Sequence, residues 1–326
     1  MNMKKSVLPF VGLIAFAFLA VLIFGNIGSD GKVGMNIAIM KGPTSLGMVN
    51  LMQKNEDGKA KNDYNIEIVG TADEIVSKLA QGEIDLAAVP CNLASVLYNR
   101  TDGDIKVAAI NTLGVLYALD RTGIISGIAD LKGNTVYNTG KGTTPEYALN
   151  YILRQNGIVH TEINIEYRSE AAELAALLAA GEADIAILPE PFVSTVLSKN
   201  SDMKIAFSLT EEWNRVQPDF KMITGVLVVR SEYLEQNKAA FDKFLEEYKS
   251  SVQAINADVA AGAKLTDKYG LVAENIAIDA IPRCNVVYVD GEEMKADISG
   301  YLQVLFEADA KSVGGKLPGD DFYYLR

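Results

Sequence analysis

The residues best suited to chemistry lie in polar, glycine-containing loops that follow apolar segments. The first loop is 41–45 (KGPTS), where Pro43, Thr44 and Ser45 open a predicted helix. A helix start presents unpaired N–H groups and the positive end of the helix dipole, which suits an anionic or strongly polar ligand group. Capping of the helix by Thr44 or Ser45 explains the same residues equally well.

Two more loops follow strand-like segments in the same half of the chain. Thr71 comes after one of them, and Cys91 and Asn92 follow Pro90 at the end of the next. Asn92 is suited both to capping the following helix and to donating a hydrogen bond to a ligand. We expect these loops to contribute ligand contacts as well.

A glycine-rich loop occupies the corresponding place in the second half. Residues 139–145 (TGKGTTP) include Gly142, Thr143 and Thr144. Glycine lets a backbone approach a ligand closely. The loop lacks the GxxxxGK[ST] spacing of a nucleotide-binding Walker loop, so it predicts ligand contact without predicting a nucleotide.

Three single side chains complete the set of candidate ligand contacts. Glu190 follows Pro189, and its carboxylate could accept from a ligand amine or stay a solvated loop charge. Tyr117 could stack on a ligand or pack in the core. Trp213 could close over a planar ligand or anchor the structure.

The sequence is poorly supplied with residues for nucleophilic or metal chemistry. His160 is the single histidine, which argues against Ser-His-Asp, Cys-His and multi-histidine metal sites. Cys91 and Cys284 are too few for a disulfide framework or a four-cysteine zinc site. We expect two buried free thiols, with one bridge between them as the alternative. No catalytic residue, metal ligand or cofactor is predicted.

The bulk composition indicates an ordinary globular protein. The 326 residues are 49% hydrophobic and 22% charged, enough for about two domains with sizeable cores. The net charge is −12, and a surface this acidic repels phosphate backbones. Nucleic acid is therefore not an expected partner.

The N-terminal region, 1–34, is predicted to be a signal peptide or an N-terminal membrane anchor with a linker. Lys4 and Lys5 precede an apolar run, 7–24, of 18 residues. A basic start before such a run is typical of secretory signals and anchors, and roughly 17–25 residues span a bilayer. Both interpretations place residues 35–326 outside the cytoplasm, secreted or held at the outer face of the membrane.

After the linker, strand-like and helix-like segments alternate. Residues 35–40, 64–69, 84–89 and 105–110 are predicted strands, and helices are expected between them, one capped by Thr71 and one by Asn92. Alternation of this kind predicts an α/β fold with largely parallel sheets covered by helices.

The chain contains an internal repeat. Residues 79–90 read LAQGEIDLAAVP and residues 178–189 read LAAGEADIAILP, with seven of twelve positions identical. The segments before and after each copy also correspond, in the order strand, helix, strand, helix. A match over four elements predicts two similar, doubly wound, Rossmann-like lobes.

The predicted lobes face each other across a ligand cleft, because ligands of open α/β sheets bind beyond the carboxyl ends of the strands. Lobe I is predicted at 35–118 with 226–326, and lobe II at 119–225. The chain crosses between them near 113–119 and again near 222–230. Two crossing strands would form a hinge.

These features resemble the type II periplasmic-binding-protein fold, and in particular the nitrate/sulfonate/taurine-type and thiamine-precursor-type solute-binding proteins of ABC importers. The stretches that carry the resemblance cover essentially all of 35–326: KGPTSLGMVNLM at 41–52, LAQGEIDLAAVPCNLASVLYN at 79–99, NTLGVLYALD at 111–120, DLKGNTVYNTGKGTTPEYALNYIL at 130–153, LAAGEADIAILPEPFVSTVL at 178–197 and ITGVLVVRSEYLEQN at 223–237. They specify the fold and not one ligand.

The resemblance implies an extracytoplasmic binding subunit, not an enzyme, that captures a small polar organic or anionic solute by hinge closure. It would act as a monomer and deliver the solute to ABC permease and ATPase subunits on separate chains. Lipid attachment is not expected, since Cys91 is the first cysteine. The alternatives are a same-fold enzyme of thiamine-pyrimidine or menaquinone synthesis and a membrane-tethered ligand sensor.

Overall fold

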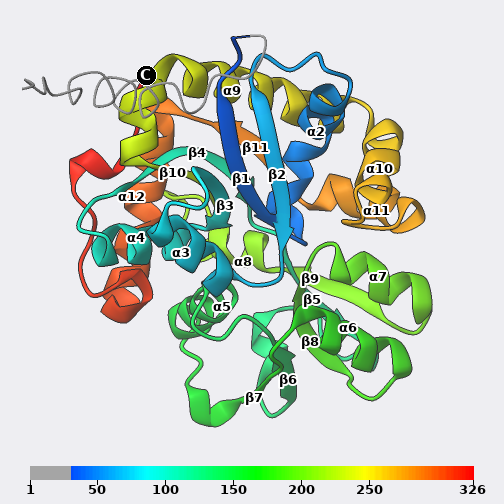
Figure 1. Ribbon diagram of the computed structural model, residues 1–326. Helices are drawn as coiled ribbons and strands as arrows, with labels where there is room; N and C mark the ends of the chain where they lie inside the picture. The colour runs from blue at the N-terminus through cyan, green and yellow to red at the C-terminus, as the bar shows by residue number, and fades with distance from the viewer. Residues whose placement is uncertain (1–30) are drawn as a thin grey trace, which may run out of the picture.

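The protein is built on two mixed sheets, as the computed structural model of residues 31–326 shows (Figure 1). The first sheet has the strand order β11-β4-β10-β3-β1-β2 and the second has the order β7-β6-β8-β5-β9. The predicted α/β class with two doubly wound layers is confirmed. The predicted signal or anchor run, 7–24, lies outside the described residues.

The strands of the first sheet are β1 (Gly34–Met40), β2 (Asp63–Val69), β3 (Leu86–Pro90), β4 (Ile105–Leu113), β10 (Ile223–Arg230) and β11 (Val286–Val289). Those of the second are β5 (Leu116–Asp120), β6 (Thr135–Asn138), β7 (Asn164–Tyr167), β8 (Ile185–Pro189) and β9 (Lys204–Ser208). In each sheet three parallel strands adjoin one antiparallel strand, β10 or β5, that carries the chain across.

Helices cover both sheets. They are α2 (Val49–Glu56), α3 (Ala72–Gln81), α4 (Cys91–Arg100), α5 (Thr144–Gln155), α6 (Ala171–Ala180), α7 (Phe192–Lys199), α8 (Leu209–Val216), α9 (Ser231–Ala257), α10 (Val259–Lys268), α11 (Glu274–Ala280) and α12 (Gly291–Ala308). Short 3₁₀ turns are η1 (Pro43–Met48), η2 (Ile128–Leu131), η3 (His160–Glu162), η4 (Ile281–Arg283), η5 (Ala310–Val313) and η6 (Asp320–Phe322). Within residues 31–326, no helix combines the length and the apolar character needed to cross a membrane.

Two local predictions need correction. Pro90, not Asn92, is the cap of α4, and Asn92 lies in its first turn. The expected α-helix after β1 begins instead as the 3₁₀ turn η1 and becomes α-helical only at Val49. The exposed turn η3 carries His160, the single histidine of the sequence.

The internal repeat appears in space as the same helix end in each lobe. Gly82 ends α3 with φ 71° and Gly181 ends α6 with φ 75°. Residues with a side chain rarely adopt this left-handed conformation, so glycine is favoured at both positions. The aspartates three residues later, Asp85 and Asp184, precede the buried strands β3 and β8.

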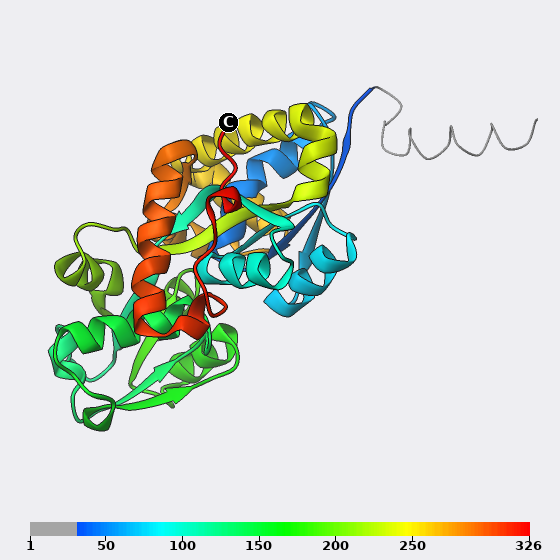
Figure 2. The ribbon, with the colours of Figure 1, turned by 90° about the vertical axis from the view of Figure 1, so that its left-hand side faces the viewer.

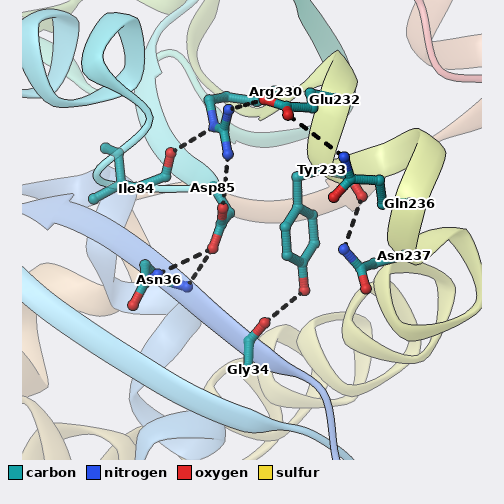
Figure 3. Close-up of polar contacts among 9 residues, drawn as sticks. All are labelled: Gly34, Asn36, Ile84, Asp85, Arg230, Glu232, Tyr233, Gln236 and Asn237. Atoms are coloured by element: carbon teal, nitrogen blue, oxygen red, sulfur yellow. Dashed lines mark hydrogen bonds and ion pairs between the residues drawn. The ribbon is translucent and has the colours of Figure 1, made fainter. Parts of the chain in front are cut away.

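Each repeated aspartate is bound by an arginine from the antiparallel strand beside it. Arg230, at the end of β10, pairs with Asp85 at 3.2 Å, and its N–H bonds the Asp85 carbonyl at 2.9 Å (Figure 3). Arg121, directly after β5, pairs with Asp184 and repeats the 2.9 Å backbone bond. The two lobes therefore share a tertiary contact that the repeat alone does not reveal.

The chain crosses from the first sheet to the second at Gly114 and Val115, between β4 and β5. A Cβ atom on Gly114 would lie 2.1 Å from Thr210 Oγ1 and 2.4 Å from Met222 Cε. Since Met222 immediately precedes β10, Gly114 lets the outgoing and returning segments pass closely. The chain thus passes from the first sheet to the second after β4 and returns to the first at β10, as predicted.

Helix α12 provides a third connection between the two halves. It packs on β4 of the first sheet and on α5 beside the second, and Figure 2 shows it running along the molecule between them. Its Tyr301 belongs to a buried apolar cluster that also includes Trp213 and Ile223. On this side the hydrophobic core is continuous from one lobe to the other.

Candidate functional site

A cleft of about 1050 Å³ lies between the carboxyl ends of the two sets of parallel strands. From the first sheet, Gly42 and Gly70 border it, just after β1 and β2. From the second, Thr139 and Ser169 border it, after β6 and β7. This is the position at which open α/β sheets bind ligands.

Three helices of the second lobe begin at the cleft without a cap from the side chain of their N-cap residue. Their N-cap residues are Thr143 for α5, Glu170 for α6 and Pro191 for α7, and none accepts a capping hydrogen bond on its side chain. At α7 the Glu190 carboxylate supplies this contact instead, because it accepts from the Ser194 N–H at 3.0 Å. Uncapped N–H groups and the positive ends of the helix dipoles therefore remain at the starts of α5 and α6. They favour an acceptor-rich or anionic group.

The cleft lining contains more positively charged than negatively charged side chains. Lys41 comes from the first lobe and Lys199 from the second, and Glu170 is the carboxylate among the lining residues. Neither lysine forms an ion pair within residues 31–326. The cleft thus carries an excess of positive charge in a chain of net charge −12.

Apolar side chains form much of the remaining wall. Phe192 from α7 and Ile68 from β2 line the cleft, together with Val272 and Ile276 from the segment around α11. Ile68 is 37% exposed, although it is a large aliphatic residue at the end of a strand. A ligand with an apolar body would cover this surface.

Of the three candidate residues in the first loop, Pro43, Thr44 and Ser45, one lines the cleft and two are buried. Pro43 lines the cleft. Ser45 is fully buried, and its hydroxyl donates to the Gly42 carbonyl at 2.8 Å. Thr44 is also buried, and its carbonyl accepts from Asn111 Nδ2 at 3.2 Å. These two polar residues shape the loop.

Thr71 performs the capping role predicted for it. Its hydroxyl accepts from the Glu74 N–H at 3.2 Å, and Glu74 in turn accepts from the Gly70 N–H at 3.1 Å. These two hydrogen bonds hold the start of α3 in place. The neighbouring Gly70, not Thr71, is in the cleft lining.

Cys91 and Asn92 lie behind the cleft, where α4 meets the second lobe. Asn92 Nδ2 donates to the Ser312 carbonyl at 3.1 Å, and Asn92 Oδ1 accepts from the Thr144 hydroxyl at 3.4 Å. Thr144 is therefore buried against the first lobe instead of facing the ligand space. Burial raises the pKa of the Cys91 thiol well above its usual range, which leaves it unreactive. Cys91 and Cys284 are free, as expected.

Within the glycine-rich loop, the cleft is lined by Thr139, Gly140 and Pro145. Gly142 and Thr143 lie beside these residues but outside the lining. The Thr143 hydroxyl donates to the Gly140 carbonyl at 2.7 Å, and this bond sets the path of the loop.

Glu190 is neither a solvated loop charge nor a cleft residue in this conformation. Its side chain has no exposure to solvent, and it pairs with Arg283 of the first lobe at 2.5 Å. Burial raises the pKa of Glu190, and hydrogen bonds from Arg283 and Ser194 oppose that rise. The carboxylate is therefore occupied by protein donors.

Tyr117 and Trp213 are placed by internal contacts. The Tyr117 hydroxyl donates to the Arg283 carbonyl at 3.1 Å. Trp213 is fully buried, and its indole N–H donates to the Phe220 carbonyl at 2.7 Å. Neither side chain is in the cleft lining. Of the two roles predicted for Trp213, the structure therefore supports the structural anchor.

Sequence reasoning missed several residues of the lining. Phe192 and Thr195 were within reach, because they follow the predicted loop at Glu190 by only a few residues. Lys199 stands at the far end of α7, where the strand-end rule gives no signal. Residues 271–276 join the cleft because α11 packs on α7, a long-range contact that no local pattern encodes.

Among residues 31–326 there is no group of three or more His, Cys, Asp or Glu side chains arranged to hold a metal ion.

Comparison with known proteins links this geometry to solute-binding proteins. Residues 105–259 match the family model described as NMT1/THI5 like. No curated protein matches the sequence.

Three solved structures illustrate the similarity of fold. An ABC transporter structure from Parabacteroides distasonis has a TM-score of 0.76 and 23% identity, covering 89% of this chain and 98% of that one. The alkanesulfonate-binding protein SsuA from Xanthomonas axonopodis pv. citri, bound to MOPS, has a TM-score of 0.68 and 14% identity, with coverages of 90% and 98%. The periplasmic nitrate-binding protein NrtA from Synechocystis PCC 6803 has a TM-score of 0.62 and 13% identity, with coverages of 86% and 84%.

These matches confirm the resemblance seen in the sequence: the chain has the fold of the periplasmic solute-binding proteins of ABC importers, and residues 105–259 are similar to the NMT1/THI5-like family model.

Proposed function

We propose that this protein is the extracytoplasmic ligand-binding subunit of an ABC importer and has no enzymatic activity of its own. The observation that carries the proposal is the cleft of about 1050 Å³ between two sheets, lined by strand ends and helix starts from both. The similar structures from ABC import systems support the same function. Permease and ATPase subunits on separate chains would receive the solute.

The first sheet forms the core of lobe I (35–118 with 226–326) and the second that of lobe II (119–225), with the proposed boundaries falling inside β5 and β10. The two lobes close about the crossing segments. A ligand that contacts both lobes stabilises the closed form by the difference between its affinities for the closed and the open form. The protein works as a monomer, secreted or anchored to the outer face of the membrane through its N-terminal region and without a lipid group.

The ligand class that best fits the cleft is a small organic anion with an apolar body. Lys41, Lys199 and the uncapped starts of α5 and α6 supply positive potential. Phe192 and Ile276 supply apolar surface on opposite lobes. An inorganic anion would use the first set of contacts and leave the second uncovered.

A thermal-shift screen of nitrate, MOPS and other alkanesulfonates, amino acids and thiamine precursors tests the proposal, together with mass spectrometry of co-purifying solutes. We expect an organic anion to raise the melting temperature, because a ligand that binds only the folded state stabilises it. Small-angle scattering should then show compaction. A binding solute that leaves the scattering unchanged would exclude hinge closure, and turnover of any solute would exclude a pure binding role.

Reversing the charge of a cleft lysine should weaken anion binding. For Lys41→Glu and for Lys199→Glu we expect a dissociation constant roughly tenfold or more higher, because each replaces attraction by repulsion at short range in a partly screened site. Isothermal titration calorimetry measures the change.

Lys204→Glu is the matched control, since Lys204 is exposed on β9 of the same lobe as Lys199 but outside the cleft lining. It should leave the dissociation constant nearly unchanged. Equal weakening by Lys199→Glu and Lys204→Glu would show that only the overall charge matters, and the assignment of cleft cations would then be wrong.

A further inference from the structure

The carboxylate of Glu190 lies in a closed cluster of three side chains, which we call the Glu190 cluster: Glu190, Ser194 and Arg283. Glu190 Oε1 accepts from Arg283 Nε at 2.5 Å and from Ser194 Oγ at 2.9 Å, and Oε2 accepts from the Ser194 N–H at 3.0 Å. Arg283 Nη2 donates to Ser194 Oγ at 2.6 Å. The buried carboxylate therefore accepts three hydrogen bonds from neighbouring donors, one of them charged.

The Glu190 cluster joins the two lobes. Glu190 follows β8 and Ser194 lies in the first turn of α7, both in the second lobe. Arg283 ends η4, between α11 and β11, in the first lobe. The ion pair thus connects positions 93 residues apart in the sequence.

Both ionic partners are also bonded to the segment where the chain crosses between lobes. The Glu190 N–H donates to the Val115 carbonyl at 3.0 Å. The Arg283 carbonyl accepts from the Tyr117 hydroxyl at 3.1 Å. Two residues further on, the Asn285 carbonyl accepts from the Leu113 N–H at 3.1 Å. The Glu190 cluster therefore lies at the hinge.

The helix that this cluster holds is a wall of the cleft. Pro191, Phe192 and Thr195 of this segment line the cleft. Glu190, Ser194 and Arg283 do not, so they do not contact a ligand in the cleft. Any effect of the Glu190 cluster on the cleft must act through the placement of α7.

We propose that Arg283 and Glu190 are positioning residues, whose ion pair fixes the first turn of α7 to the hinge and so sets the ligand-facing wall of lobe II relative to lobe I. Without Arg283, the carboxylate would be buried without its cation, which is strongly unfavourable. The start of α7 would then move to hydrate the charge. The consequence for ligand affinity rests on the proposed function, whereas the effect on α7 does not.

A pH dependence in the Arg283→Ala variant distinguishes this role from simple packing. The titratable and charged groups around Glu190 are Arg283, Tyr117 and Cys284, with Glu211 acting on Tyr117. Burial raises the pKa of Tyr117 to about 12 and that of Cys284 well above its usual range, so both stay neutral. Since burial favours the protonated form of Glu190, α7 in this variant should dock better as the pH falls and worse as it rises.

Hydrogen exchange of the α7 backbone amides in the ligand-free full-length protein tests the proposal. In Arg283→Ala we expect protection of α7 to fall about tenfold or more near pH 8 and to recover largely near pH 6. In Glu190→Gln/Arg283→Ala, which buries no charge, protection should stay within about threefold of the parent at both pH values. Arg121→Ala, which breaks an ion pair within lobe II alone, is the control and should leave α7 unchanged.

Three results would overturn the proposal: unchanged α7 protection in Arg283→Ala, an equal loss of protection throughout both lobes, or a double variant no better than the single one. A binding assay with MOPS and nitrate adds the functional readout, and any probe that binds the parent should bind Arg283→Ala about tenfold more weakly. If neither probe binds the parent, the anion class in the proposed function is wrong, but the exchange result still decides the role of Arg283.

Discussion

Replacement of Arg230 by alanine is expected to lower the unfolding free energy by about 3–5 kcal/mol, because it leaves the buried carboxylate of Asp85 without its cation. Asp85 is 4% exposed. One of its oxygens accepts from the Asn36 N–H at 2.9 Å and from the Asn36 amide at 3.3 Å, and the other from Arg230 (Figure 3). Urea unfolding followed by circular dichroism measures the loss.

The second lobe provides a control, because it contains the same arginine–aspartate pair with more exposed side chains. Arg121 and Asp184 occupy the equivalent positions, but their side chains are 38% and 48% exposed. Arg121→Ala should therefore cost only about 0–1 kcal/mol. Asp85→Asn added to Arg230→Ala should restore part of the stability by removing the buried charge. Equal losses for Arg230→Ala and Arg121→Ala would contradict the dependence on burial.

Replacement of Trp213 by alanine is also expected to cost about 3–5 kcal/mol, because it empties a fully buried site. The indole ring packs 4.9 Å from the ring of Tyr151 on α5 and 5.4 Å from that of Tyr301 on α12. These helices belong to different halves of the molecule, so the cavity would weaken their contact. Thermal unfolding by calorimetry gives the change.

Two further variants separate the contributions at this position. Trp213→Phe keeps an aromatic ring but frees the Phe220 carbonyl from its 2.7 Å hydrogen bond, and we expect a loss of about 1–3 kcal/mol. Phe192→Ala removes an aromatic ring that is half-buried at the cleft, and its cost in stability should be about 1 kcal/mol or less. A larger loss for Phe192→Ala than for Trp213→Ala would show that the core is not organised around Trp213.

The arrangement of elements could be predicted from the sequence because each signal for it is local. The alternation of buried strands and amphipathic helices, and the repeat at 79–90 and 178–189, indicate two similar lobes without any knowledge of long-range contacts. The rule that ligands bind beyond strand ends then selects the loops. Loops at Gly42, Gly70 and Thr139 do border the cleft.

The individual ligand-facing side chains could not be predicted in the same way. Polar residues at strand ends can bind a ligand or form hydrogen bonds within the protein, and here most of them bond within the protein. Ser45 bonds its own loop, Thr71 caps α3, and Glu190 holds Arg283. Which role applies depends on contacts such as Glu190–Arg283, whose partners are 93 residues apart.

The position of Trp213 gives the protein a built-in optical probe. It is the single tryptophan of the chain, so the indole emission comes from one place, between the rings of Tyr151 and Tyr301 where the lobes share a core. A rotation of α12 relative to α5 would change the packing around the indole and hence its emission wavelength and quenching. Lobe movement in this protein could therefore be followed in real time by stopped-flow fluorescence, without attaching a dye.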